Sequence, residues 1–147
     1  MTLERLSEFL GREIAVTEWM EITQERIDKF ADATDDQQWI HVDPERAQRD
    51  SPYGATIAHG FLTLSLLPKL LNDSIHLLDL RMAINYGLNR VRFPAPVRAG
   101  SLIRARIVLQ SMRDVPDATE AGYSITIEIQ GAEKPCCVAE LLARYYR

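Results

Sequence analysis

The sequence predicts an α+β fold in which an antiparallel sheet packs against one buried helix. Residues 103–110 and 123–130 alternate between apolar and polar side chains, as half-buried strands do. Residues 60–71 are apolar on nearly every side, which is typical of a buried helix. Four predicted strands follow that helix with short connections, and short connections favour antiparallel pairing.

The first half of the chain predicts one strand, one helix and a long irregular segment. Residues 13–22 are expected to form the first strand, and Thr23 is a suitable N-cap for a helix running to about residue 33. Residues 34–58 are rich in Asp, Pro, Ser and Gly, so that only a short helix at Pro44–Arg49 is expected there. Long irregular segments in compact domains often carry function.

The second half predicts three irregularities in its elements. Pro68 should kink or shorten the buried helix. In the strand at 82–93 the apolar phase shifts, which predicts a bulge around Gly87–Asn89. In the last strand, 136–146, Cys136 and Cys137 are adjacent and therefore unsuited to a structural disulfide.

Length and composition favour a single globular domain over residues 1–147. The chain is 46% hydrophobic and 26% charged. A net charge of −4 argues against an overall nucleic-acid-binding surface. No segment is long and apolar enough for a membrane span. Charged residues interrupt the apolar positions near the N-terminus, so that a signal peptide is not expected there. A cytoplasmic protein that binds neither nucleic acid nor membrane is expected.

The three histidines and one glycine are the candidates for chemistry. His41 follows Asp36 by five residues, which suggests an acid–base pair, although a turn role for the aspartate and a structural role for the histidine stay open. His59 could cap the buried helix or fill a polar pocket, and His76 is expected at the surface. Gly60 begins the buried helix, where a free N–H can bind an oxyanion; close packing of helix on sheet explains a glycine equally well.

Two motifs resemble the MaoC-like dehydratases, which include the (R)-specific enoyl-CoA hydratases. The first runs Asp-Gln-Gln-Trp-Ile-His from Asp36 to His41, and the second runs Thr-Ile-Ala-His-Gly-Phe-Leu from Thr56. The sequence Gln-Trp-Ile-His in the first motif is most similar to the branch named after nodulation protein N, and so is the segment 85–97. The resemblance implies a hot dog fold, an antiparallel sheet wrapped around a long central helix. It also implies a homodimer.

The resemblance assigns roles to specific residues. Asp36 and His41 would form a catalytic dyad that grips the water added to a 2-enoyl thioester of CoA or of a carrier protein. We favour Asp36 as the base, while the residues leave that division open. Gly60 would supply the oxyanion N–H, with Gln38 and His59 in support, and neither a metal nor another cofactor is required.

The chain departs from the family pattern at a few positions. Gln37, Gln38 and Trp39 replace the usual Phe, Asn and Pro of the first motif, and Pro68 stands where many (R)-specific hydratases have Ser. These changes concern substrate preference and rate more than the class of reaction.

Two other functions compete with hydration. Hot dog thioesterases often carry a carboxylate on the central helix, but residues 60–71 contain none. A non-catalytic acyl-thioester binding protein would need no acid–base pair. Four arginines, Arg90, Arg92, Arg104 and Arg106, are candidates for a CoA phosphate site, although a solvated strand face explains them as well.

Overall fold

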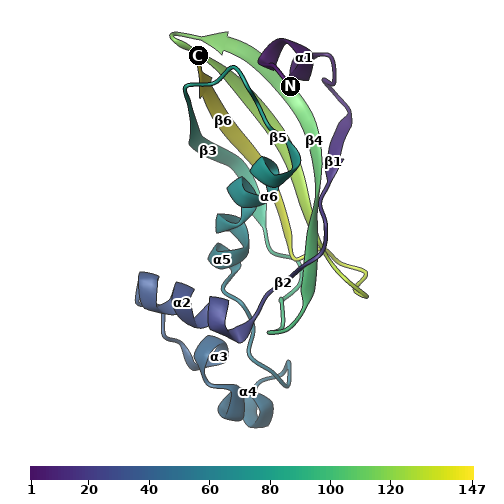
Figure 1. The fold of residues 1–147 in the computed structure, drawn as a ribbon. Helices are drawn as coiled ribbons and strands as arrows, with labels where there is room; N and C mark the ends of the chain where they lie inside the picture. Colours follow the sequence, from purple (N-terminus) through teal and green to yellow (C-terminus); the bar gives the residue numbers. More distant parts are fainter.

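One antiparallel sheet forms the body of the molecule in the computed structural model, which describes all 147 residues (Figure 1). Its strands are β1 (Glu13–Val16), β2 (Met20–Glu21), β3 (Met82–Arg92), β4 (Leu102–Val115), β5 (Ala118–Ile129) and β6 (Cys137–Tyr146). The order is β1-β4-β5-β6-β3, with β2 beside β4. Strand β3 is therefore one edge of the sheet.

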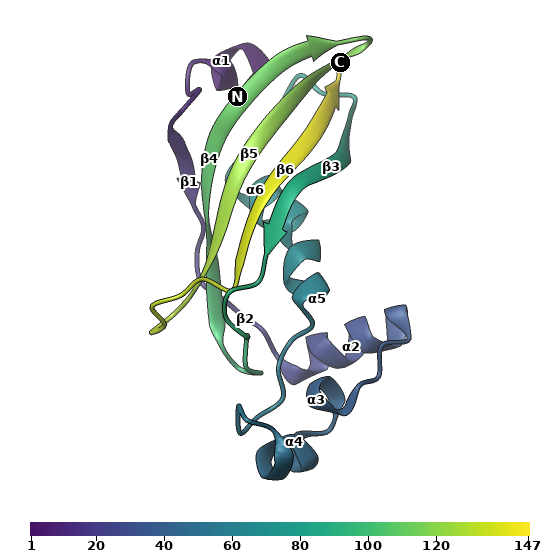
Figure 2. The ribbon, with the colours of Figure 1, turned by 180° about the vertical axis from the view of Figure 1, so that it is seen from behind.

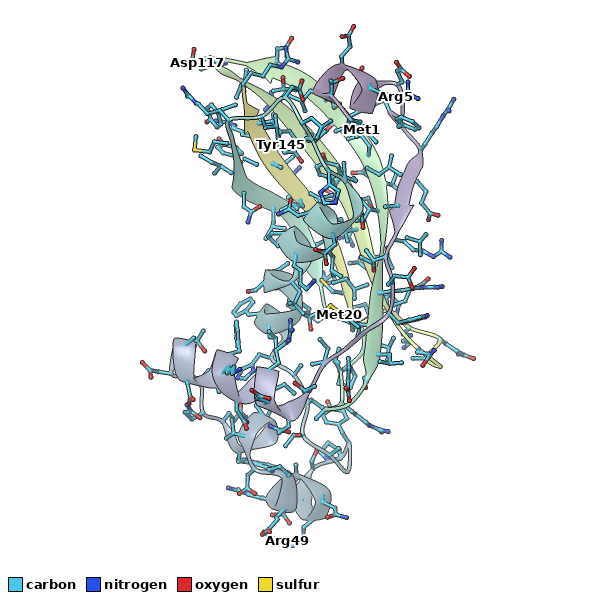
Figure 3. The ribbon with its side chains drawn as sticks, viewed as in Figure 1. Met1, Arg5, Met20, Arg49, Asp117 and Tyr145 are labelled. Carbon is cyan, nitrogen blue, oxygen red and sulfur yellow. The ribbon has the colours of Figure 1, made fainter.

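The helices form two groups (Figures 1 and 2). Helices α5 (Gly60–Ser65) and α6 (Leu67–Ser74) lie against one face of the curved sheet, while the short α1 (Leu3–Ser7) lies near its far end. Helices α2 (Gln24–Thr34), α3 (Trp39–Val42) and α4 (Pro44–Asp50) form a second group beyond the start of α5. In Figure 3, Arg49 at the end of α4 and Asp117 in the β4–β5 turn mark opposite ends of the molecule.

The core lies between the sheet and helices α5 and α6. It contains 26 buried hydrophobic residues in one cluster. Alternate residues of β6 are buried, and the inner positions of β4 and β5 that the alternation predicted, among them Ile107 and Ile125, are completely buried. The predicted arrangement of an antiparallel sheet on a buried helix is confirmed.

The buried helix is broken and not buried all round. Helix α5 ends at Ser65 and α6 begins at Leu67, because Pro68 has no N–H to bond the carbonyl of Leu64. The N–H of Leu66 bonds the carbonyls of both Leu62 and Thr63, which tightens the turn at the break. The helix that the sequence predicted to be buried still has one side open to solvent, since Phe61 is 68% exposed.

Several strand boundaries also differ from expectation. The predicted strand 13–22 is split into β1 and β2, because the Thr17 hydroxyl takes the place of a backbone acceptor and binds the N–H of Ala105 at 2.9 Å. Strands β4 and β5 run further, to a turn in which Asp117 has a φ of 63°. The predicted bulge in β3 is confirmed by register shifts between Asn85 and Gly87 and between Leu88 and Arg90.

Candidate active site

The segments that carry the two motifs lie next to each other at the start of α5. Helix α2 ends at Thr34, and its C-cap residue Asp35 has a left-handed conformation with a φ of 57°, which turns the chain toward Asp36. The N–H of Ile57 then bonds the carbonyl of Ile40 at 3.0 Å, fixing the second motif beside α3. The irregular segment 34–58 is therefore two short helices and a turn that hold the motif residues.

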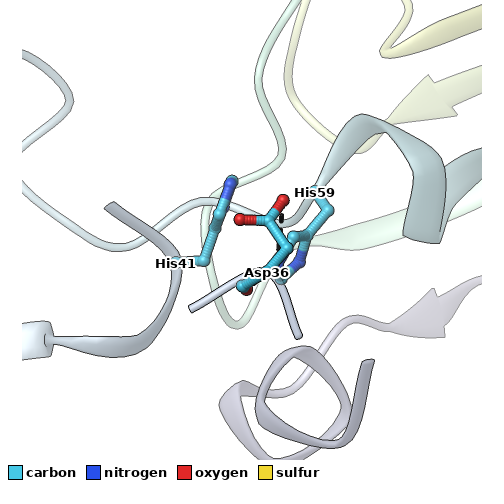
Figure 4. A group of neighbouring side chains, drawn as sticks. All are labelled: Asp36, His41 and His59. Atoms are coloured by element: carbon cyan, nitrogen blue, oxygen red, sulfur yellow. Dashed lines mark hydrogen bonds and ion pairs between the residues drawn. The ribbon is translucent and has the colours of Figure 1, made fainter. Parts of the chain in front are cut away.

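Asp36, His41 and His59 form a compact group, as Figure 4 shows. One carboxylate oxygen of Asp36 and one ring nitrogen of each histidine lie within 4.8 Å of one another. The two histidine side chains are buried, with exposed fractions of 7% and 3%, whereas the Asp36 side chain is 53% exposed. The Asp–His pair expected from spacing is thus close in space, with its carboxylate open to solvent.

Hydrogen bonding fixes the tautomer of His41. Its Nδ1 lies 2.6 Å from the carbonyl oxygen of Ile57, and a carbonyl can only accept. The neutral ring therefore carries its hydrogen on Nδ1 and presents a bare Nε2. Burial lowers the pKa of His41, and the nearby His59 lowers it further, against the opposing effects of the Ile57 hydrogen bond and the Asp36 charge.

Gln24 holds the backbone of His41 in place. Its Nε2 donates to the carbonyl of His41 at 2.7 Å and to Asp28 Oδ1 at 2.9 Å. Its Oε1 accepts from the hydroxyl of Thr56, a buried residue of the second motif. Sequence reasoning missed this connection, because nothing in the spacing of Gln24 separates it from an ordinary first-turn residue.

Gly60 and Gln38 have different surroundings. The N–H of Gly60 makes no hydrogen bond within the chain, and the residue lines a pocket of about 310 Å³ together with Ile57, Phe93 and Cys136. The dyad side chains do not line this pocket, although Ile57 touches both. The Gln38 side chain is exposed and makes no hydrogen bond, while its carbonyl accepts from the N–H of His41.

The same three side chains do not have the geometry of a metal site. The rings of His41 and His59 are stacked, with centroids 3.8 Å apart and an interplanar angle of 22°. Nitrogen lone pairs lie in the ring plane, so those of stacked rings run side by side and do not converge on one ion. His41 Nδ1 and His59 Nε2 also already have backbone partners.

Other candidate residues lie outside this group. His76 is exposed, as expected. Arg104 and Arg106 both bind Glu128 and are held in ion pairs, whereas Arg90 and Arg92 at the edge of the sheet have no carboxylate partner. Cys136 and Cys137 are free and buried, and burial raises their pKa values to about 12 and about 11. None of the helices has the length and hydropathy to span a bilayer.

Comparison with known proteins identifies the family. Residues 6–129 match the MaoC like domain, and the chain belongs to the MaoC-like dehydratase family. It is 52% identical over 136 residues to 3-hydroxyacyl-thioester dehydratase Z of Mycobacterium tuberculosis, which covers 92% of this chain and 89% of that protein. It is 42% identical over 145 residues to Nodulation protein N of Rhizobium meliloti, covering 97% and 90%.

A solved structure confirms the fold. The (R)-hydratase from A. caviae superposes with a TM-score of 0.75 at 23% identity, covering 91% of this chain and 94% of that one. The chain therefore has the hot dog fold, with its central helix in two segments, α5 and α6.

Proposed function

We propose that this hydro-lyase adds water to trans-2-enoyl thioesters to give (R)-3-hydroxyacyl thioesters, and catalyses the reverse dehydration. The observation that carries the proposal is the buried His41, whose bare Nε2 is available to a water molecule beside the Asp36 carboxylate. The names of the dehydratase and hydratase relatives support the same reaction.

The hydrogen bond from His41 to Ile57 favours His41 as the base, which reverses the division expected from sequence. A neutral ring with its hydrogen on Nδ1 can accept but not donate at Nε2. In the proposed step, Nε2 removes one hydrogen of the water while the water oxygen bonds to C3. The electron pair of the C2–C3 double bond moves toward the thioester, and the imidazolium then returns the hydrogen to C2. The Asp36 carboxylate accepts a hydrogen bond from the second hydrogen of the water, which stays on the new C3 hydroxyl, and the charge of Asp36 stabilises the imidazolium.

Gly60 is proposed to stabilise the charge that develops on the thioester oxygen. Its N–H lacks a partner in the chain and its residue lines the pocket beside Ile57. A hydrogen bond to an oxygen that becomes more negative is stronger in the transition state than in the ground state, and so accelerates the chemical step.

The substrate is proposed to be a thioester of CoA or of a carrier protein. The pocket beside Gly60 is lined mainly by apolar side chains, which suits an acyl or pantetheine chain. Of the four arginines considered for the phosphates, Arg90 and Arg92 are the ones without a carboxylate partner. They are the better candidates for that contact.

A homodimer joined along β3 is also proposed. This edge strand carries exposed apolar side chains, namely Met82, Ile84, Tyr86 and Leu88, and the nearby Phe61 and Phe93 are exposed as well. An edge of this kind presents unpaired backbone groups to a second copy of the sheet. Pairing would also cover the exposed face of α5.

The thioesterase alternative has no carboxylate in the right place. Helix α6 extends beyond residue 71 and includes Asp73, but this side chain is 58% exposed and paired with Lys69. It lies outside the residues that line the pocket at Gly60.

The test is hydration of crotonyl-CoA and longer 2-enoyl-CoAs by the purified chain, followed by absorbance, with the configuration of the product determined. Formation of the (R)-3-hydroxyacyl thioester supports the proposal. Release of free thiol without hydration would favour a thioesterase, and binding without turnover of any enoyl thioester would favour a non-catalytic binding protein. Asp36→Asn, with Asp35→Asn as the matched control, links the activity to the site.

A further inference from the structure

His59 is the most completely buried ionisable side chain at the site, and no step of the proposed reaction uses it. It is the N-cap residue of α5, but its side chain makes no capping hydrogen bond. The expectation that it could cap the helix is therefore wrong. A buried histidine beside the dyad therefore needs another role.

The ring of His59 contacts both members of the dyad. Its Nε2 lies 3.0 Å from the backbone carbonyl of Asp36, which can only accept, so that the neutral ring carries its hydrogen on Nε2. Its face stacks on the ring of His41 with centroids 3.8 Å apart. Phe30 of α2 packs on His59 at 4.9 Å with an interplanar angle of 57° and holds it in place.

The remaining nitrogen, Nδ1, is buried without any hydrogen-bond partner. Burying an unpaired polar atom destabilises the folded chain, and an apolar side chain that only filled this space would avoid the penalty. A buried polar atom without a partner needs an explanation, and a functional role is one such explanation.

We propose that His59 is a positioning residue for the dyad, which holds the backbone of Asp36 through its Nε2–H and the ring of His41 through its face. This inference rests on the proposed hydration function. The two contacts make separate demands. The first needs a donor at Nε2, and the second needs a flat ring that keeps water from His41. Histidine meets both, whereas phenylalanine supplies only the ring and glutamine only the donor.

The stacked ring also affects the protonation of His41. The ionisable groups that face His41 are Asp36 and His59, and Asp28 on α2 reaches its backbone through Gln24. Burial is the largest cause of the lowered pKa of His41, and the His59 ring supplies part of that burial. Removing the ring admits water and should raise the pKa of His41 toward its ordinary value.

The experiment compares His59→Phe and His59→Gln with the unaltered chain, and uses His76→Gln as a control at an exposed histidine. The pH dependence of kcat/KM for crotonyl-CoA hydration is measured for each. His59→Phe keeps the ring that buries His41 and removes only the charge effect of His59, so its acid limb should move less than that of His59→Gln. It should lower kcat roughly tenfold to a hundredfold, because Asp36 is no longer held. His59→Gln should lose less kcat on the high-pH plateau, and its acid limb should move to higher pH.

A purely structural role predicts a different result. Equal losses of kcat in both variants, with an unmoved acid limb and equal losses in thermal stability, would overturn the proposal. A second readout is independent of activity, since the chain has three histidines whose ring nitrogens can be followed by NMR. Hydrogen on Nδ1 of His41 and on Nε2 of His59 supports the inference, and the opposite tautomers would overturn it.

The two readouts also separate this inference from the proposed function. If the unaltered chain hydrates no enoyl thioester, the proposed function fails, and the His41 titration followed by NMR decides the positioning role. An upward shift of that titration in His59→Gln supports the contact described above, and an unchanged titration refutes it.

Discussion

Gly60→Pro removes one N–H from the site and should leave the fold intact. Gly60 is the first residue of α5, a position where proline is favoured. The preceding His59 has a φ of −58° and a ψ of 135°, the extended conformation that proline requires of its neighbour. Because the N–H of Gly60 has no partner in the chain, no structural hydrogen bond is lost.

The matched control for this change is Gly60→Ala. A Cβ at this position would meet the Phe93 ring at 3.1–3.2 Å, so both substitutions push on the same neighbour. The Phe93 side chain is 42% exposed and can shift outward. Alanine keeps the N–H and adds the same Cβ, and therefore it controls for the contact with Phe93.

The expected loss follows from the proposed role. Removing one preorganised oxyanion donor typically lowers kcat by about 10²–10³, which corresponds to roughly 2.7–4 kcal/mol of transition-state stabilisation. Gly60→Pro should show this loss relative to Gly60→Ala, with a smaller change in KM, in an assay of crotonyl-CoA hydration. Circular dichroism and thermal melting establish that both variants fold. A folded Gly60→Pro variant with the kcat of Gly60→Ala would refute the oxyanion role.

Three further predictions concern the dyad, its titration and the dimer. Asp36→Asn and His41→Gln should each lower kcat by about 10²–10⁴, and the double variant should lose less than the product of the single losses. Full activity of Asp36→Asn together with an inactive Asp35→Asn would show that the assignment of the site is wrong. Because burial lowers the pKa of His41 and the base must be neutral, activity should fall with decreasing pH only below about 6.5, and an acid limb above that value in kcat/KM would contradict the assignment. Ile84→Lys places a charge on the β3 edge and should shift a dimer to a monomer in sedimentation, whereas an unaltered chain that is itself monomeric at micromolar concentration would exclude the dimer.

The parts of the fold that depend on periodic burial could be predicted from the sequence. Alternation located β4 and β5, and the phase shift near Gly87 located the bulge in β3. The extension of β4 to Val115 was missed, because polar side chains such as Arg113 follow a further register shift after Leu109 and interrupt the pattern. Short elements such as α1, which has five residues, give too few turns for a periodic signal.

The pair of Asp36 and His41 could be predicted from the sequence, but the contacts that surround the pair could not. Spacing and family resemblance selected Asp36 and His41, and the structure places them together. The contacts of Ile57 and Gln24 with His41 could not be read from the sequence. The first uses a backbone carbonyl, which every residue type possesses, and both join residues more than ten positions apart whose proximity only the fold creates.

The main-chain support of His41 has a consequence for how the protein can vary. At Ile57 the carbonyl orients the imidazole, and the same residue is among those that line the pocket beside Gly60. A mutation at this position replaces the side chain and leaves the carbonyl in place. Under the proposed function, the pocket can therefore be reshaped for a longer or shorter acyl group without disturbing the carbonyl that orients the histidine. Within one residue, the shape of the pocket is thus separated from the orientation of the histidine ring.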